Sequence, residues 1–380
     1  MRRIIGLASV CGAGVALAMG CRGGAADRTD APFLGRASFT RAEYAAAPRL
    51  ALRRLYAICE GGRTPECQFR LIDLAALGPG RRVLLVQAGA VAQEFDSAGR
   101  WSGPLGRLSA GPGEYRNAMA LGFDSAGGVA VFDLAAFRIV RFDHLRRAAW
   151  TASVRYSVEF AGVSAKGGRV VQWLVPGSEP RGGIVMSQFA LLDSTGGSEA
   201  FASVATKALR VPGSDMVPIQ PFFAVWAVWD VDPVLSIVYA PGDRMQIERY
   251  RGDGVAELLI EGDVPLRPVT SAEVEASLDR NFLRRVPTAA AQLREAARNA
   301  AGFHPAITGL AVLVDGSIWA KGSPASESDS TRYDVFSRDG RLTGYVMLPA
   351  AARVIDGDQS VVLVAAVDGA GAPFAAVYRR

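Results

Sequence analysis

The stretch Phe95-Asp-Ser-Ala-Gly99 is one of several related stretches that recur along the chain and predict its fold. In each one a run of apolar residues ends in an aromatic or large aliphatic residue, and Asp and Gly usually follow close behind. The residues that end these runs are Phe95, Phe142, Leu192, Tyr250, Phe336 and Tyr378. An apolar run closed by an Asp/Gly turn is typical of a β-strand in a hairpin, so the pattern predicts a repeated unit of β-hairpins.

The spacing of these six marks predicts the size of the unit. Successive marks lie 47, 50, 58, 86 and 42 residues apart. A unit of roughly 40 to 50 residues is typical of a β-propeller blade. Only the interval of 86 residues fails to fit one unit, and an insertion there would explain it.

A helical segment inside the long interval supplies that insertion. Thr270 followed by Glu273 is a capping-box signature at the start of a helix. Three apolar residues after it share one helical face: Val274, Leu278 and Phe282. We expect a first helix over about 271–285, a break at Pro287 and a second, Ala-rich helix that ends near Asn299.

The strands within the units are fully apolar or alternating, as in Val83–Val86 and Val361–Val367. A βαβ fold would need a helical pattern between successive strands, and the sequence has only one helical stretch. The sequence therefore predicts an all-β fold, a six-bladed β-propeller with a helical insertion at about 270–300. The last unit ends one strand short, so we expect a strand from about 49–74 to complete it and close the ring.

The first 20 residues differ from the rest of the chain. Two arginines precede an apolar stretch over residues 4–19, which is shorter than a bilayer span needs and has the form of a signal peptide. We expect residues 1–20 to be a signal peptide, residues 21–44 a flexible linker and residues 45–380 the propeller.

The end of that segment, Leu17-Ala-Met-Gly-Cys21, resembles a bacterial lipoprotein signal, in which the cysteine is lipidated before cleavage. Ala18 departs from that pattern, because Leu is the commonest residue at its position. The resemblance implies lipidation of Cys21 and an exported protein in the periplasm or outer envelope, held to the membrane by an N-terminal lipid. Ordinary cleavage near Ala18 or Ala26 and an uncleaved membrane anchor are the alternatives.

The cysteines that follow Cys21 are Cys59 and Cys67, and Gly61, Gly62 and Pro65 lie between them. A turn in this segment would bring the two thiols together. In an oxidising, exported compartment such a pair favours a small disulfide, with free thiols or another role as the alternative.

Charge gives no sign of a nucleic-acid partner. Apart from the two arginines of the signal peptide, 40 basic residues face 37 acidic ones, without long basic runs. With 50% hydrophobic residues, the chain can bury a large core.

Four further stretches resemble a known family. The stretches Gly111-Pro-Gly-Glu-Tyr115, 122–133, 138–143 and 314–319 resemble bacterial six-bladed β-propellers related to NHL-repeat proteins. The resemblance covers about residues 70–380. It implies a fold and export, often as a lipoprotein, but no activity.

The Gly-Pro-Gly turn of that family motif suggests one binding site. Its glycines would let a ligand approach the backbone, with Glu114 and Tyr115 beside it. An ordinary turn between two blades is the alternative interpretation of the same residues.

An aromatic group suggests a second site, for stacking on sugars or peptides. Its members are Phe222, Phe223, Trp226 and Trp229. Because apolar residues occupy both faces of this stretch, a strand buried on two sides is the alternative.

Three carboxylates near predicted strand ends, Asp230, Asp232 and Asp263, suggest a calcium site if they converge. The only histidines are His144 and His304, so a zinc site of three histidines is excluded. We assign no metal ligands and expect no cofactor, with calcium kept for the alternative function.

The sequence therefore predicts a non-catalytic binding or scaffold propeller at the cell envelope. We expect a monomer that holds a protein, peptide or glycan. The alternative is a metal-dependent, calcium-type hydrolase or lactonase with carboxylates in the central tunnel. The side chains that line the tunnel distinguish the two hypotheses.

Overall fold

The computed structural model describes residues 32–62, 64–87, 89–155, 160–174, 184–207, 223, 227–281, 294, 297–323 and 329–380. The predicted signal peptide, the lipidation candidate Cys21 and the earlier part of the predicted linker lie outside these residues.

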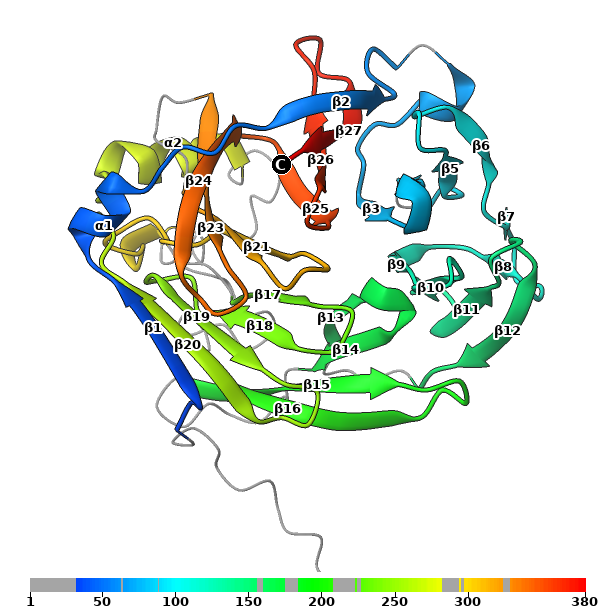
Figure 1. Ribbon diagram of the computed structural model, residues 1–380, viewed down its shortest axis with the longest axis horizontal. Helices are drawn as coiled ribbons and strands as arrows, with labels where there is room; N and C mark the ends of the chain where they lie inside the picture. The colour runs from blue at the N-terminus through cyan, green and yellow to red at the C-terminus, as the bar shows by residue number, and fades with distance from the viewer. Residues whose placement is uncertain are drawn as a thin grey trace, which may run out of the picture.

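Six β-sheets are arranged around a central axis (Figure 1). In five of the sheets four consecutive strands pair antiparallel, and in the sixth three consecutive strands pair with a strand from the N-terminal side of the chain. The first of the consecutive strands lies innermost in each sheet (Figure 1). The first three sheets contain β3 (Leu74–Leu77), β4 (Val83–Val86), β5 (Gln93–Phe95) and β6 (Trp101–Pro104); β9 (Ala118–Phe123), β10 (Val129–Asp133), β11 (Arg138–Phe142) and β12 (Ala148–Ser153); and β13 (Phe160–Ser164), β14 (Val170–Leu174), β15 (Ile184–Leu192) and β16 (Ser198–Lys207). The other three contain β17 (Val228–Val231), β18 (Ile237–Ala240), β19 (Gln246–Tyr250) and β20 (Ala256–Gly262); β21 (Gly309–Val312), β22 (Ile318–Lys321), β23 (Ser330–Phe336) and β24 (Leu342–Pro349); and β25 (Arg353–Gly357), β26 (Val361–Val367), β27 (Pro373–Arg379) and β2 (Arg53–Ile58).

The predicted all-β, six-bladed propeller is confirmed. The six residues that mark the repeat occupy the same position in their blades. Each mark lies at or next to the end of the third strand of its blade, from Phe95 in β5 to Tyr378 in β27. In the first five blades the Asp/Gly residues that follow make the tight turn to the fourth strand, and Gly99 and Gly196 have positive φ there. The recurring sequence pattern therefore marks the end of the third strand in each of the six blades.

The strands are apolar on both faces because each sheet is packed between two others. Six clusters of buried side chains fill the six gaps between neighbouring blades. Each cluster takes side chains from both of the blades that enclose it. Burial on both faces of a sheet produces near-continuous apolar runs, as in β4, where all four residues are buried.

The ring closes with the strand expected from residues 49–74. Strand β2 pairs antiparallel with β27, from Arg53 opposite Arg379 to Ile58 opposite Ala375. This confirms the predicted closure, in which the two ends of the propeller share one blade.

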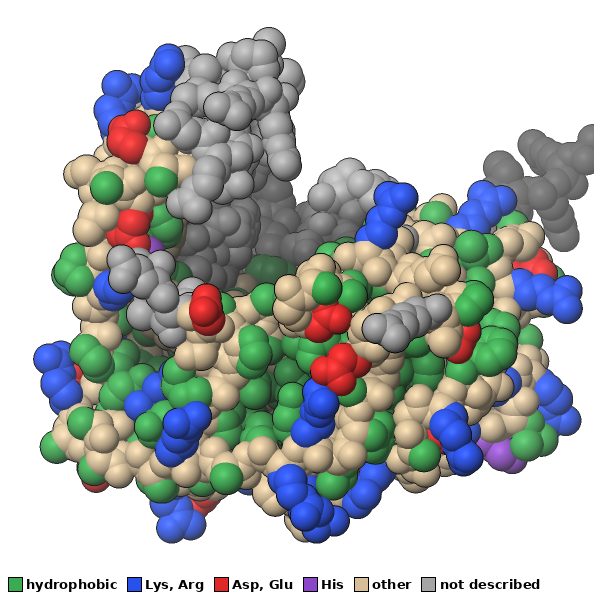
Figure 2. Space-filling model, turned by 90° about the horizontal axis from the view of Figure 1, so that it is seen from above, with side chains coloured by type: hydrophobic (Ala, Val, Ile, Leu, Met, Phe, Trp, Pro, Cys, Tyr) green, Lys and Arg blue, Asp and Glu red, His purple; other side chains and the backbone are tan. Residues whose placement is uncertain are grey.

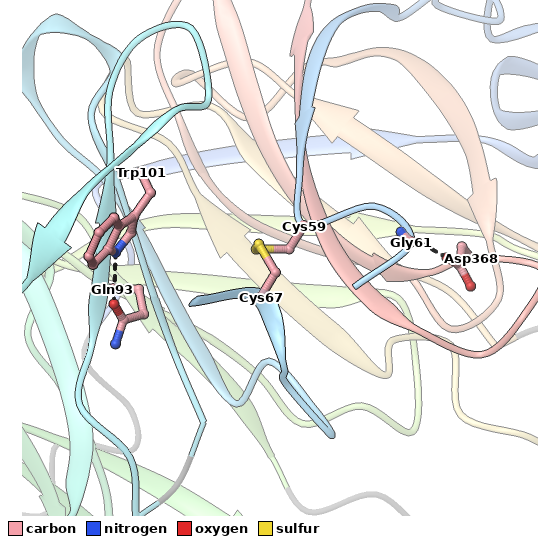
Figure 3. The surroundings of a disulfide bond; sticks show 6 residues. All are labelled: Cys59, Gly61, Cys67, Gln93, Trp101 and Asp368. Atoms are coloured by element: carbon pink, nitrogen blue, oxygen red, sulfur yellow. Dashed lines mark hydrogen bonds between the residues drawn. A yellow bond between two sulfur atoms is a disulfide. The ribbon is translucent and has the colours of Figure 1, made fainter. Parts of the chain in front are cut away.

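A disulfide follows directly after the closing strand (Figure 3). Cys59 and Cys67 are joined with an S–S distance of 2.00 Å. In the loop between them, the Gly61 amide donates to Asp368 Oδ2 at 3.2 Å. The disulfide and this hydrogen bond hold the loop beside the last blade.

The segment before the closing strand corrects the prediction of a flexible linker over 21–44. Residues Gly35–Phe39 form β1, which pairs parallel with β20 as a fifth strand of that blade. Helix α1 (Arg41–Ala46) follows, and Thr40 and Glu43 cap its first turn. A short polar segment can pair with an open sheet edge through its backbone alone, so composition gives little sign of such a strand.

Helix α2 (Ser271–Asn281) lies where the first insertion helix was expected, and Thr270 and Glu273 make its capping hydrogen bonds. The predicted remainder of that helix, the break at Pro287 and most of the second helix lie outside the described residues. In Figure 2 the described part of the insertion rises above the ring on the left. No helix of the described ranges has the length and apolar character to cross a bilayer.

Antiparallel pairing gives the ring two distinct faces. The connections between blades, including the insertion between β20 and β21, lie on one face, which we call the insertion face. The turns between first and second strands and between third and fourth strands lie on the other, which we call the turn face. The innermost strands run from the insertion face to the turn face.

Candidate functional site

A cavity of about 500 Å³ lies on the axis of the ring. All six innermost strands contribute to its wall, together with Lys321 and Tyr333 from the second and third strands of the fifth blade. The contributing residues include Asp73, Leu74, Met119, Leu121, Gly162, Lys166, Trp229, Asp230, Thr308, Leu310, Arg353 and Ile355. Most of them lie at the beginnings of the innermost strands, so the mouth of the cavity is at the insertion face.

The floor of the cavity, toward the turn face, is an ion pair. Lys166 follows β13, and its ammonium pairs with the Asp230 carboxylate of β17. Lys166 Nζ also donates to the Val312 carbonyl at 2.8 Å, and Asp230 Oδ2 accepts from the Val312 amide at 2.7 Å. Only 14% of the Lys166 side chain and 13% of the Asp230 side chain are exposed, so these contacts tie three blades together in a largely dry place.

A glycine allows this floor to form. A Cβ atom at Gly122 of β9 would lie 2.0 Å from the Ala165 carbonyl oxygen, directly before Lys166. Only glycine permits such a close approach of two backbones.

A second carboxylate lies close to the floor. Asp356 of β25 is buried, and its carboxylate accepts from the Gly357 amide at 2.8 Å and the Leu77 amide at 3.4 Å. Burial raises the pKa of Asp356 to about 6, although the charge of Lys166 acts in the opposite direction. The charge of Asp230 adds to the rise.

Two cations at the mouth differ from Lys166 because, among the described residues, they contact backbone carbonyls and not a carboxylate. Lys321, the last residue of β22, donates from Nζ to the carbonyls of Ala350 at 2.9 Å and Ala352 at 3.0 Å. Arg353, the first residue of β25, donates from Nη2 to the carbonyl of Ile72 and, at 3.3 Å, to that of Asp73. Each cation thus joins its own blade to the next connection of the ring, and neither forms an ion pair with a carboxylate of the described residues.

The two mouth cations are close enough to influence each other. Burial lowers the pKa of Lys321, and the nearby positive charge of Arg353 lowers it further. Lys321 Nζ lies 5.9 Å from the centre of the Tyr333 ring, and the Tyr333 hydroxyl donates to the Ala352 carbonyl that Lys321 also contacts. The mouth therefore holds two neighbouring positive charges beside a phenol ring.

Trp229 supplies an aromatic part of the wall. Its ring centre lies 5.0 Å from that of Phe189 and 6.1 Å from that of Trp173, so it also belongs to the core between two blades. A Cβ atom at Gly162 would lie 3.5 Å from Trp229, which shows how closely β13 approaches the indole. Of the other predicted aromatic residues, Phe223 contacts His304 with ring centres 4.8 Å apart, while Phe222 and Trp226 lie outside the described residues.

The Gly-Pro-Gly turn does not present its side chains to a ligand. Tyr115 is fully buried, donates to the Leu105 carbonyl at 2.8 Å and accepts from the Ala92 amide at 2.9 Å. Glu114 accepts from the Gly111 amide at 2.7 Å and so closes its own turn. Burial raises the pKa of Tyr115 to about 12. Because both side chains serve the connection between two blades, we do not carry this pair forward as a binding site.

The three predicted calcium ligands do not converge. Asp230 is paired with Lys166, Asp232 accepts from the amides of Val234 and Ser236 in its own turn, and Asp263 pairs with Arg41 at 2.9 Å. No group of three or more His, Cys, Asp or Glu side chains suited to a metal ion occurs in the described ranges.

The two histidines have different surroundings. His144 is exposed in a turn. His304 is buried, and its Nε2 lies 3.2 Å from Glu273 Oε1 at the start of α2. Hydrogen bonds from Arg267, then from Thr270 and His304, lower the pKa of Glu273 to about 2. These contacts join the start of α2 to the segment that leads into β21.

Lys166, Lys321 and Arg353 were not among the residues predicted for a site. One signal was present, because the chain has only three lysines among its 42 basic residues, and two of them line the cavity. Their strand positions alone do not show which way the side chains turn.

No protein-family model matches the chain, and no curated protein matches it. Solved structures do match. A Bacteroides fragilis protein that is thought to be exported covers 91% of this chain and 99% of its own, with 10% identity and a TM-score of 0.51. The likeness is one of fold.

Two further structures match at lower TM-scores. A member of the DUF4221 family from Bacteroides vulgatus covers 87% of this chain and 97% of its own, with 8% identity and a TM-score of 0.47. Virginiamycin B lyase from Staphylococcus aureus covers 81% of this chain and 94% of its own, with 10% identity and a TM-score of 0.41.

Proposed function

We propose that this protein is an exported, non-catalytic binding propeller that holds a small ligand, or the end of a peptide or glycan, in the axial cavity. The observation that carries the proposal is the cavity of about 500 Å³ to which all six blades contribute. Its size lies within the roughly 300 to 1,000 Å³ typical of small-molecule sites.

The cavity is formed in advance of binding. Lys321 and Arg353 are held by backbone carbonyls of neighbouring connections, and Lys166 is held by Asp230 and Val312. A site whose polar groups are already fixed loses little entropy when it binds a ligand.

Thermal unfolding in the presence of a collection of small acids, sugars and short peptides tests this function. A ligand of the folded state raises the melting temperature. Met119, which lines the mouth and is 39% exposed, is replaced in the variant Met119→Trp to fill the cavity. Leu145, which is 59% exposed in a turn on the other face, gives the matched control Leu145→Trp.

We expect at least one compound to stabilise the wild type and Leu145→Trp but not Met119→Trp. Stabilisation that survives in Met119→Trp, or no stabilisation by any compound, would contradict a ligand site in the cavity.

The alternative function is a calcium-type hydrolase or lactonase, and two carboxylate residues line the cavity, Asp73 at the mouth and Asp230 at the floor. The ammonium of Lys166 lies where a cation beside Asp230 would lie. Calcium titration followed by thermal unfolding tests this alternative, which predicts a rise in melting temperature that Asp230→Asn abolishes.

We also propose that the mouth of the cavity points away from the membrane. This orientation assumes that Cys21 is lipidated. Strand β1 runs toward the insertion face, and Leu34 before it donates to the Ala256 carbonyl near the turn face. The tether from Cys21 to Leu34 spans at most about 45 Å, so it would hold the turn face toward the bilayer. Mass spectrometry of the N-terminal peptide and fractionation of Cys21→Ser test the anchor, which predicts release of that variant from the membrane fraction.

A further inference from the structure

Within the described ranges Lys321, one of the two mouth cations, lacks the partner that partly buried cations in proteins normally have. Cations in partly buried places are usually paired with carboxylates, because burial without an opposite charge is unfavourable. Lys321 is only partly exposed, and its hydrogen-bond partners are two neutral carbonyls.

Arg353, which is exposed, adds a second positive charge near Lys321. Its hydrogen bonds come from Nη2 and go to two backbone carbonyls, and its Nε and Nη1 atoms bond to no other described residue. A guanidinium offers five N–H donors in a planar fork that fits a carboxylate or a phosphate. Both cations therefore keep donors without a partner among the described residues, and both line the same cavity.

We infer that Lys321 and Arg353 bind the anionic group, a carboxylate or a phosphate, of the ligand that enters the axial cavity. This inference rests on the proposed function and names the chemistry of its ligand. An anion between the two cations would offset their mutual repulsion and use their free donors.

The rest of the cavity indicates the body of such a ligand. Trp229 and Leu310 offer apolar surface below the mouth, and Tyr333 lies beside Lys321. The floor cation Lys166 already has its carboxylate, Asp230, so it does not compete for the anion. A compact ligand with an anionic end and a flat, apolar body fits this arrangement.

Benzoate, phenyl phosphate and the neutral isostere benzamide are suitable probes, and isothermal titration calorimetry with the full chain is the measurement. We expect one or both anions to bind at least tenfold more tightly than benzamide, because the charged ends gain hydrogen bonds to cations. The preference between benzoate and phenyl phosphate shows which anion the site favours. Added salt should weaken the binding of the anions but not that of benzamide.

The variants Lys321→Met and Arg353→Met should each weaken anion binding by about tenfold. Arg379→Met is the matched control, because Arg379 is an exposed cation at the end of β27 near the turn face. It changes the net charge equally and should leave anion binding unchanged.

Binding of both anions no tighter than that of benzamide, or equal losses in Arg379→Met and Lys321→Met, would overturn the inference. The comparison of the two anions with benzamide needs only the wild type, so the test stands even if a variant fails to fold. If benzamide and both anions bind alike and Met119→Trp blocks all three, this inference fails while the proposed function stands. If no probe and no compound of the collection binds, both fail.

Discussion

The floor and the mouth of the axial cavity each hold lysine, under opposite conditions. At the floor, Lys166 lies against Asp230, and the two side chains bind the backbone of a third blade. At the mouth, Lys321 lies near another cation, Arg353, and contacts neutral carbonyls. A lysine beside a carboxylate can stabilise the ring, whereas a lysine without one keeps a donor for the ligand that we propose.

Breaking the floor pair should have the largest effect. Lys166→Met leaves Asp230 as a largely buried charge without its partner, and we expect a loss of about 3 kcal/mol in the free energy of unfolding. Urea denaturation measures it. The double variant Lys166→Met/Asp230→Asn should recover part of the lost free energy of unfolding, because it also removes the unpaired charge of Asp230. A single variant as stable as the wild type would show that the pair does not hold the blades together.

The second carboxylate near the floor predicts a pH dependence. The pKa of Asp356 is about 6 in the folded protein against 3.8 for the free side chain. Between these values the folded state binds more protons than the unfolded state, so the free energy of unfolding should fall as the pH rises toward 6. The slope from this group should reach about 1 kcal/mol per pH unit.

The variant Asp356→Asn should lack this slope and be more stable than the wild type above about pH 6. Urea denaturation of both proteins from acidic to neutral pH gives the comparison. Parallel curves for the two proteins would mean that Asp356 does not titrate in this range.

Removing a mouth cation should affect stability least. Lys321→Met loses two hydrogen bonds to carbonyls but also relieves burial of a charge and its repulsion by Arg353, so we expect a change of about 1 kcal/mol or less. The same urea experiment measures it. A loss as large as that of Lys166→Met would remove the distinction between the floor and the mouth.

The fold was predictable because it repeats. The end of the third strand has a similar sequence in each blade. Phe95 and its counterparts therefore predicted both the length of the repeated unit and the number of blades. The closing strand followed from the short last unit. Strand β1 escaped prediction because its pairing with β20 joins segments more than 200 residues apart in the sequence, and its own pattern is weak.

The cavity was predictable only in part. Trp229 and Asp230 drew attention by residue type, yet the partner that defines Asp230 is Lys166, 64 residues earlier in the sequence. Lys321 and Arg353 come together only when two blades are placed side by side. Patterns within a strand predict burial, whereas a site on the axis of a ring depends on which side chains from separate blades meet there.

Selective acetylation of lysine by a mild amine reagent tests the contrast between floor and mouth most directly. Lysine reacts through its uncharged amine, which a lowered pKa makes more abundant. The chain has only three lysines, so peptide mass spectrometry can follow each one separately. We predict that Lys321 reacts well before Lys166 and that the anion that binds, benzoate or phenyl phosphate, slows the reaction of Lys321 alone. Equal reaction of Lys166 and Lys321, or no protection of Lys321 by either anion, would contradict the account.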